Sequence, residues 1–93
     1  MKIWNIELSN KVQKQYKKLP KKIKELFGLL ILDLEKTGPV QGSWKNYGKL
    51  SDSKHHCHLK KGRPTYVCCW EVTSKTIKLI EVYYVGSHEK APY

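Results

Sequence analysis

The spacing of apolar residues changes from that of a strand to that of helices within the first forty positions. Residues 2–8 alternate apolar and polar side chains, which is the period of a half-buried strand. Ser9 can cap a short helix whose apolar residues recur at i, i+4 and i+7, and Pro20 separates it from a second helix. That second helix carries one apolar stripe as far as Gly38. The pattern predicts a strand followed by a hairpin of two helices.

The rest of the sequence returns to the strand pattern. Residues 38–53 hold several glycines and polar residues and are expected to form a long connection. Residues 54–60 and 65–72 are expected to form a β-hairpin, and residues 76–85 a last strand that pairs back. This order predicts an α+β fold. An N-terminal strand, a two-helix hairpin and a three-stranded antiparallel segment would form one sheet, with the helices on one face.

The sequence carries a large excess of positive charge for its size. Ninety-three residues make a single domain, residues 1–93, and its 18 Lys and Arg against 8 Asp and Glu give a net charge of +10. Such a charge favours association with a polyanion. Two groups of cations stand out. One comprises Lys11, Lys14, Lys17, Lys18, Lys21, Lys22 and Lys24 on the helices, and the other Lys54, Lys60, Lys61 and Arg63.

The cysteines indicate that the protein works in a reducing compartment, and the apolar runs predict no membrane-spanning segment. The three cysteines are odd in number, and Cys68 and Cys69 should point to opposite faces of one strand, so a disulfide framework is not expected. The longest apolar run, residues 29–32, is far too short to cross a bilayer, and the N-terminus lacks an apolar signal segment. We expect a cytoplasmic protein without a membrane partner.

The most unusual segment is His55-His56-Cys57-His58. On a strand, His56 and His58 share one face, and His55 and Cys57 share the other. Histidine is suited to general acid or base catalysis near neutral pH. Two alternatives remain open, namely solvated histidines without a role and a zinc site. The alternating faces and the absence of paired ligand spacing disfavour zinc, so neither a metal nor a cofactor is expected.

Two further groups of residues could contact RNA. Lys60, Lys61 and Arg63 follow the histidine strand, where cations suit a phosphate, although they could also merely make the hairpin tip soluble. Trp44 and Lys45 in the long connection combine an aromatic ring with a cation, which is a common platform for an unstacked base. Trp44 could equally anchor the core.

The chain resembles the RelE/ParE toxin superfamily, and most of all its RelE- and YafQ-like messenger-RNA endonucleases. The resemblance covers nearly the whole chain. It rests on the element order, the basic helix hairpin, the string Gln41-Gly42-Ser43-Trp44-Lys45 and the string Val85-Gly86-Ser87-His88 that closes the last strand. The sequence departs from the YafQ pattern in two places. No histidine precedes the Gln-Gly-Ser-Trp string, and the hairpin has no Asp-Trp pair.

The resemblance implies a set of catalytic residues. His58 and His88 are similar to the family's catalytic histidines, Tyr93 to its terminal aromatic residue, and Arg63 to its phosphate-contacting arginine. We expect the histidines to act as base and acid, in either order, in a metal-independent attack of the ribose 2′-OH on the adjacent phosphate. Lys60 would join Arg63 in neutralising the charge that develops.

The resemblance also implies the partners. The substrate would be mRNA, cut on the ribosome in the A site, with a cognate antitoxin that silences the toxin. The remaining cations are expected to hold RNA, together with Trp44; they are Lys17, Lys18, Lys21, Lys22, Lys45 and Lys61. Two other functions stay open. One is a non-catalytic inhibitor of DNA gyrase of the ParE type, and the other is a basic RNA-binding protein that does not cleave.

Overall fold

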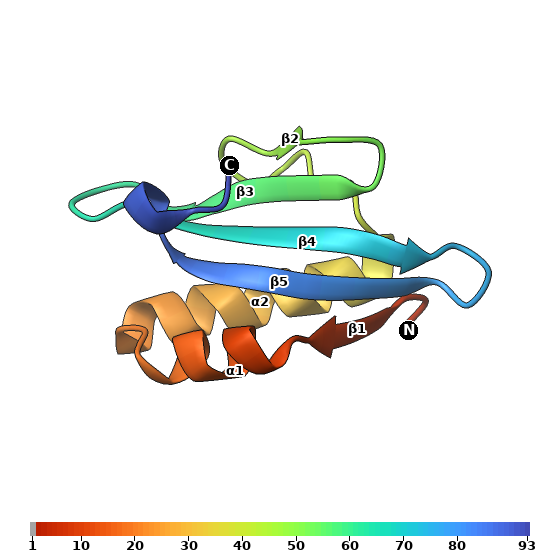
Figure 1. The fold of residues 1–93 in the computed structure, drawn as a ribbon, viewed down its shortest axis with the longest axis horizontal. Helices are drawn as coiled ribbons and strands as arrows, with labels where there is room; N and C mark the ends of the chain where they lie inside the picture. The colour runs from red at the N-terminus through yellow and green to blue at the C-terminus, as the bar shows by residue number, and fades with distance from the viewer. Residues whose placement is uncertain (1) are drawn as a thin grey trace.

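The computed structural model of the protein describes residues 2–93. One five-stranded sheet runs in the order β1-β5-β4-β3-β2, and the two helices accompany it (Figure 1). The elements in chain order are β1 (Asn5–Leu8), α1 (Asn10–Lys17), α2 (Lys21–Thr37), β2 (Gly48–Lys49), β3 (Lys54–Lys60), β4 (Tyr66–Ser74), β5 (Leu79–Ser87) and the 3₁₀ turn η1 (His88–Lys90). The predicted α+β class and the two-helix hairpin are confirmed.

The helix ends follow local signals in the sequence. The Ser9 side chain accepts a hydrogen bond of 3.1 Å from the backbone N–H of Val12, which caps α1 as predicted. Gly38 ends α2 with φ of 88°, a conformation that suits glycine. A side chain here would also collide with Trp4, since a Cβ would lie 2.7 Å from the indole Nε1. Gly38 therefore both ends the helix and lets the chain before β1 pack closely against it.

The sheet is mainly antiparallel, as expected, with one parallel pair. β1 runs parallel to β5, and the other neighbours are antiparallel. The two-residue strand β2 was not expected. It pairs Gly48 and Lys49 with His56 and His55, and a strand this short leaves no alternation to detect in the sequence. β5 begins at Leu79, three residues later than predicted, because residues 75–78 form the turn.

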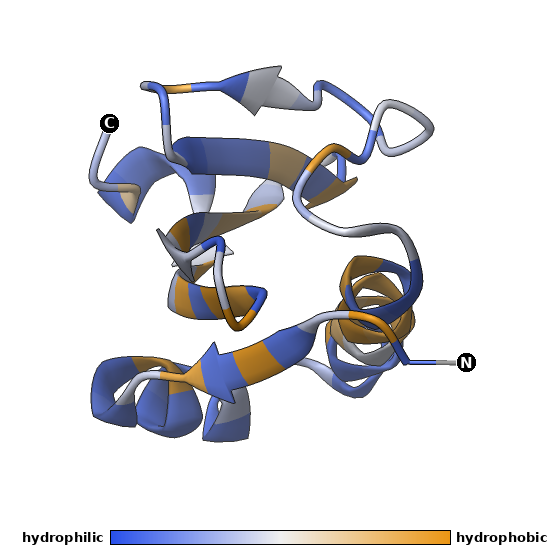
Figure 2. Cartoon of the chain, turned by 90° about the vertical axis from the view of Figure 1, so that its right-hand side faces the viewer, coloured by the Kyte–Doolittle hydropathy of each residue, from blue (hydrophilic) through white to orange (hydrophobic). Residues whose placement is uncertain are grey.

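The hydrophobic core lies between the helices and one face of the sheet. Figure 2 shows α2 nearly end-on beside the strands, with hydrophobic residues on both. α2 buries four side chains against Cys57, Cys68, Trp70, Ile80 and Val82 of the sheet. No helix within residues 2–93 is long and apolar enough to span a membrane.

The opposite face of the sheet has a second, smaller cluster and no helix over it. Val67, Cys69 and Tyr84 form this cluster, and Ala91 of the C-terminal segment packs on it. Cys68 and Cys69 thus point to opposite faces, as predicted, and all three cysteines are buried free thiols. The helix-free face is therefore available to carry a functional site.

Candidate functional site

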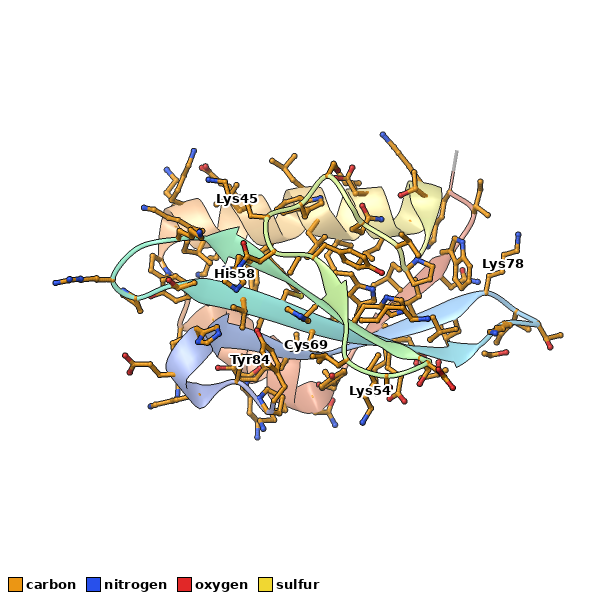
Figure 3. All side chains as sticks on the ribbon, turned by 90° about the horizontal axis from the view of Figure 1, so that it is seen from above. Lys45, Lys54, His58, Cys69, Lys78 and Tyr84 are labelled. Carbon is orange, nitrogen blue, oxygen red and sulfur yellow. The ribbon has the colours of Figure 1, made fainter. Side chains whose placement is uncertain are left out.

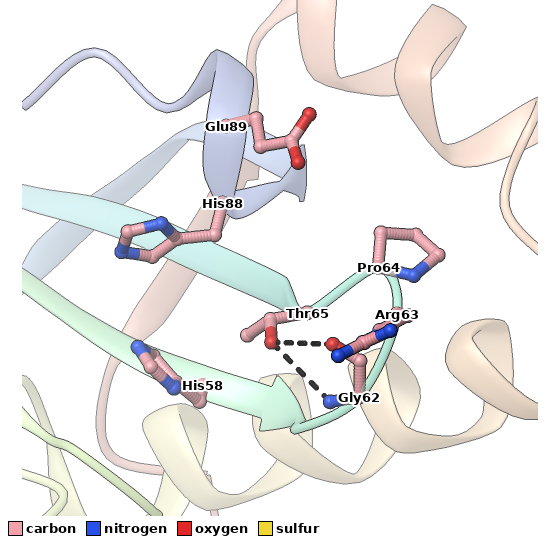
Figure 4. Close-up of a pocket in the computed structure, with 7 residues that line it drawn as sticks. All are labelled: His58, Gly62, Arg63, Pro64, Thr65, His88 and Glu89. Atoms are coloured by element: carbon pink, nitrogen blue, oxygen red, sulfur yellow. Dashed lines mark hydrogen bonds between the residues drawn. The ribbon is translucent and has the colours of Figure 1, made fainter.

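A hollow of about 590 Å³ lies at the end of β3, between the β3–β4 turn and η1 (Figure 4). It is lined by His58, Gly62, Arg63, Pro64, Thr65, His88 and Glu89. Three residues predicted to be catalytic, His58, Arg63 and His88, therefore meet around one hollow, which we name the histidine pocket. His58 and Arg63 belong to β3 and the turn that follows it, whereas His88 comes from η1, after the last strand.

The alternation of β3 divides the histidine run between the two faces of the sheet. His55 faces the helices, stacks on Trp70 with ring centroids 6.0 Å apart, and pairs through Nδ1 with the Tyr47 hydroxyl at 2.7 Å. His56 and His58 face the C-terminal segment. The strand rule thus assigned each histidine to the correct face, and His55 is part of the core.

His58 is held from its backbone by the long connection. Its N–H donates a hydrogen bond of 2.7 Å to the carbonyl oxygen of Lys45. Viewed from above, Lys45 and His58 lie close together towards the end of the molecule opposite to Lys78 (Figure 3). The backbone of the long connection at the exposed residue Lys45 is thereby joined to β3 at His58.

The β3–β4 turn is fastened to both sides of the pocket by Thr65. The Thr65 hydroxyl accepts a hydrogen bond of 3.2 Å from the Gly62 N–H and donates one of 3.0 Å to the Gly62 carbonyl oxygen. These bonds brace the loop that carries Arg63 (Figure 4). The backbone N–H of His88 donates to the Thr65 carbonyl oxygen at 2.8 Å, which joins η1 to the same turn.

Four rings gather on this face of the sheet. The centroids of His58 and His88 lie 5.6 Å apart with 72° between the ring planes, and His88 meets Tyr93 edge-on at 5.9 Å. Tyr93 also packs on His56, with centroids 4.7 Å apart. In the described part of the chain, the buried Nδ1 atoms of His56 and His58 have no hydrogen-bond partner. Both nitrogens are thus left without a group that fixes their proton.

Burial and neighbouring charges favour the neutral form of two of these histidines. The pKa of His58 is lowered from the ordinary value of 6.5, first by burial and then by the positive charges of His88, His56 and Lys61. Burial, followed by the charge of His88, lowers the pKa of His56 in the same way. A neutral imidazole can accept a proton on its unprotonated ring nitrogen, so His58 has the properties of a general base.

Lys60 does not line the histidine pocket. The pairing of β3 with β4 shifts register between His58 and Lys60, and such a bulge redirects the side chain that follows it. Lys60 instead lines a neighbouring hollow with Lys22 of α2. The strand rule alone would have kept Lys60 on the same face as His58.

The other predicted RNA contacts fall into two groups. Lys17, Lys18 and Lys21 are exposed around the turn between the helices, at the same end of the molecule as the β3–β4 turn and η1 (Figure 1). Trp44 instead packs against the core, and its Nε1 donates a hydrogen bond of 2.8 Å to Asp33 Oδ2. These are the contacts of a core anchor, one of the two roles left open for Trp44.

Three residues of this region were not predicted from the sequence to belong to the site. Glu89 lines the pocket, Thr65 braces the turn, and His56 supports Tyr93. The position of Glu89 next to His88 was a usable signal. Nothing in the sequence indicates that the Thr65 hydroxyl turns back onto Gly62, because that contact depends on the shape of the loop.

The side chains of the pocket suit acid–base chemistry on a phosphate ester. Two imidazoles can transfer protons, and a guanidinium can stabilise negative charge on phosphate oxygens. Within residues 2–93, no three His, Cys, Asp or Glu side chains are grouped as metal ligands would be.

Comparison with known proteins identifies the fold. No family model matches the sequence, and no curated protein matches it. Among solved structures, a mutant of the E. coli toxin RelE in its free state superposes with a TM-score of 0.73 and 15% sequence identity. The match covers 98% of this chain and 88% of that one. The chain therefore has the fold of RelE.

Proposed function

We propose that this protein is the toxin of a bacterial type II toxin–antitoxin system and acts as a metal-independent endoribonuclease on mRNA. The observation that carries the proposal is the meeting of His58, Arg63 and His88 around one pocket, although His88 lies far along the chain from the other two. The RelE-like fold supports it independently of these residues.

In this mechanism His58 is the base. Its neutral imidazole takes the proton from a ribose 2′-OH, and the oxygen attacks the adjacent phosphorus. His88 donates a proton to the leaving 5′-oxygen as that bond breaks. The products are a 2′,3′-cyclic phosphate and a 5′-hydroxyl end. The lowered pKa of His58 favours this assignment of the two roles over the reverse.

Charge stabilisation falls mainly to Arg63. It lines the histidine pocket and can form two hydrogen bonds to the phosphate oxygens as negative charge builds on them. Lys60, on the far side of the turn, adds positive potential. Tyr93 is 47% exposed and touches both His56 and His88, so it can stack on a base next to the scissile phosphate.

The proposed partners follow from the charge and the fold. The exposed lysines around the helix turn would hold ribosomal RNA while mRNA is cut in the A site of the ribosome. An acidic, partly disordered antitoxin encoded beside the gene would neutralise the toxin in the cytoplasm. Co-expression of that neighbour should relieve growth arrest.

The test is in-vitro translation of a reporter mRNA, followed by primer extension to map cuts. We expect cleavage that requires His58 and His88 and that leaves a 2′,3′-cyclic phosphate and a 5′-hydroxyl end. Gyrase-dependent DNA breaks without RNA cuts would instead establish the gyrase-inhibitor function. RNA binding with neither kind of cut would establish a passive RNA-binding protein, and either result overturns the proposal.

A further inference from the structure

The turn that carries Arg63 has a second hollow on its other side. This hollow, of about 260 Å³, lies between the start of α2 and the β3–β4 turn, and we call it the lysine notch. The notch and the histidine pocket share Gly62, Arg63 and Pro64. Arg63 therefore lies between the two hollows, within reach of groups bound in either.

The notch brings together the two basic groups of the sequence. Lys22 comes from the helix hairpin, whereas Lys60 and Arg63 come from the β-hairpin, nearly forty residues later. No acidic residue lines the notch, and none of its three cations forms an ion pair with any residue in the range 2–93. Three exposed, unneutralised cations around one hollow attract an anion, which would offset their mutual repulsion.

The walls of the notch are rigid compared with its cations. Ile23, with only 2% of its surface exposed, and the partly buried Tyr66 both pack into the core. Pro20 and Pro64 restrict the backbone on the two sides. The long cationic side chains thus surround a small hollow that is large enough for a phosphate group.

We propose that the lysine notch binds the backbone phosphate next to the scissile phosphate in the RNA strand. The inference rests on the proposed function, because it takes the histidine pocket as the site of cleavage. The strand would cross the β3–β4 turn at Arg63, with the scissile phosphate on the histidine side and its neighbour between Lys22 and Lys60. The notch thereby sets the register of the strand against His58 and His88.

The test measures affinity for a short, fully 2′-O-methylated RNA, which cannot be cut by 2′-OH attack. Uncharged methylphosphonate linkages replace single phosphates along it, one per oligonucleotide. For the parent protein, neutralising the phosphate next to the scissile position should weaken binding about two- to fivefold, as for an exposed ion pair. We call this weakening the penalty for neutralising a phosphate. The double variant Lys22→Ala with Lys60→Ala should show no penalty for the phosphate next to the scissile one and should keep the penalty for the scissile phosphate.

Matched controls separate a specific site from general charge. Lys36→Ala with Lys75→Ala removes the same charge from positions distant from the turn, and should keep both penalties. The single variant Lys22→Ala should also reduce the loss of affinity caused by neutralising the phosphate next to the scissile one. The conclusion then does not depend on the substitution of Lys60. The slope of log affinity against log salt should become shallower by about 0.7 in the notch variant, corresponding to one lost phosphate contact.

The outcomes distinguish failure of the notch from failure of the proposed function. Suppose that the parent cleaves mRNA but that each of the two penalties has the same size in the notch variant as in the parent. The inference is then wrong, while the proposed function stands. If the parent neither binds the RNA nor cleaves mRNA, both are wrong. If the notch variant loses affinity for poly-glutamate and not for RNA, the notch is a site for an acidic polypeptide, and the inference is overturned.

Discussion

The backbone N–H of His88 donates a hydrogen bond of 2.8 Å to the carbonyl oxygen of Thr65. This bond joins the segment that carries one catalytic histidine of the proposed mechanism to the turn that carries Arg63. The Thr65 hydroxyl meanwhile closes the turn onto Gly62. Thr65 therefore holds two parts of the histidine pocket in register, through its backbone on one side and its side chain on the other.

Removing only the hydroxyl should loosen one side of the pocket. Thr65→Val keeps the shape of the side chain but cannot bond to Gly62, so Arg63 loses its support while the His88 bond remains. We expect cleavage to fall about tenfold, with unfolding free energy lowered by only about 1 kcal/mol. Thr76→Val, at an exposed position of another turn, is the control. Unchanged cleavage by Thr65→Val would show that the turn needs no bracing.

The two histidines should affect chemistry and not binding. His58→Gln and His88→Gln keep approximate size and polarity but cannot transfer protons at neutral pH, so cleavage should fall about 10²–10⁴-fold in each. RNA affinity, measured by fluorescence anisotropy, should stay within about twofold of the parent. If both variants cleave mRNA as fast as the parent, the proton-transfer mechanism is wrong, and a lysine-based mechanism takes its place.

The fold was largely predictable because each element carries its own pattern. The apolar stripe of α2 and its end at Gly38 are local signals, and so is the cap at Ser9. β2 has no such signal, since it exists only because residues 48–49 lie beside β3. The end of the last turn was also missed, because Thr76 and Ile77 have strand-forming side chains although they lie in a turn.

The candidate site was predictable where strand alternation decided it and less so elsewhere. Alternation placed His58 on the correct face, and His88, identified through the resemblance, comes within 5.6 Å of it between ring centroids. The same rule could not have placed Lys60, because the pairing of β3 with β4 shifts register between His58 and Lys60. Contacts between distant segments, such as that of Trp44 with Asp33, depend on tertiary packing, and the sequence left them undecided.

Trp44 should matter for stability and not for RNA binding. Its Nε1 hydrogen bond to Asp33 joins the long connection to α2, and its ring packs on the core. Trp44→Phe keeps an aromatic ring but leaves the partly buried carboxylate without this donor. We expect unfolding free energy to fall by about 1–3 kcal/mol in urea denaturation, with RNA affinity unchanged. A large loss of affinity without a loss of stability would return Trp44 to a base-stacking role.

Cleavage should not need a divalent metal. The proposed mechanism uses two imidazoles and a guanidinium, and each step moves a proton between named groups. With purified protein and an RNA substrate that is cut without ribosomes, excess EDTA should leave the rate within about twofold. Loss of activity on chelation, restored by one equivalent of zinc, would point to metal binding by His56, His58 and His88. Ribosome-dependent cleavage would need a chelator test at constant magnesium, with a zinc-selective chelator.

Lys61 should shift the acid limb of the pH profile of cleavage through its charge beside His58. The base must be neutral to act, so kcat/KM should fall as pH drops through the pKa of His58, which lies below 6.5 in the folded protein. The charge of Lys61 contributes to that lowering, and Lys61→Gln should therefore raise the pKa and move the acid limb to higher pH. Lys60→Gln is the control, because Lys60 is not among the groups that lower the pKa of His58.

The pH profile separates this effect from weaker RNA binding. Loss of a phosphate contact lowers kcat/KM by the same factor at every pH, whereas a raised pKa lowers it most at acidic pH and leaves the midpoint displaced upward. We expect the second pattern for Lys61→Gln and only the first for Lys60→Gln. A midpoint for Lys61→Gln that equals the parent's, or lies below it, would mean that the acid limb belongs to a group other than His58.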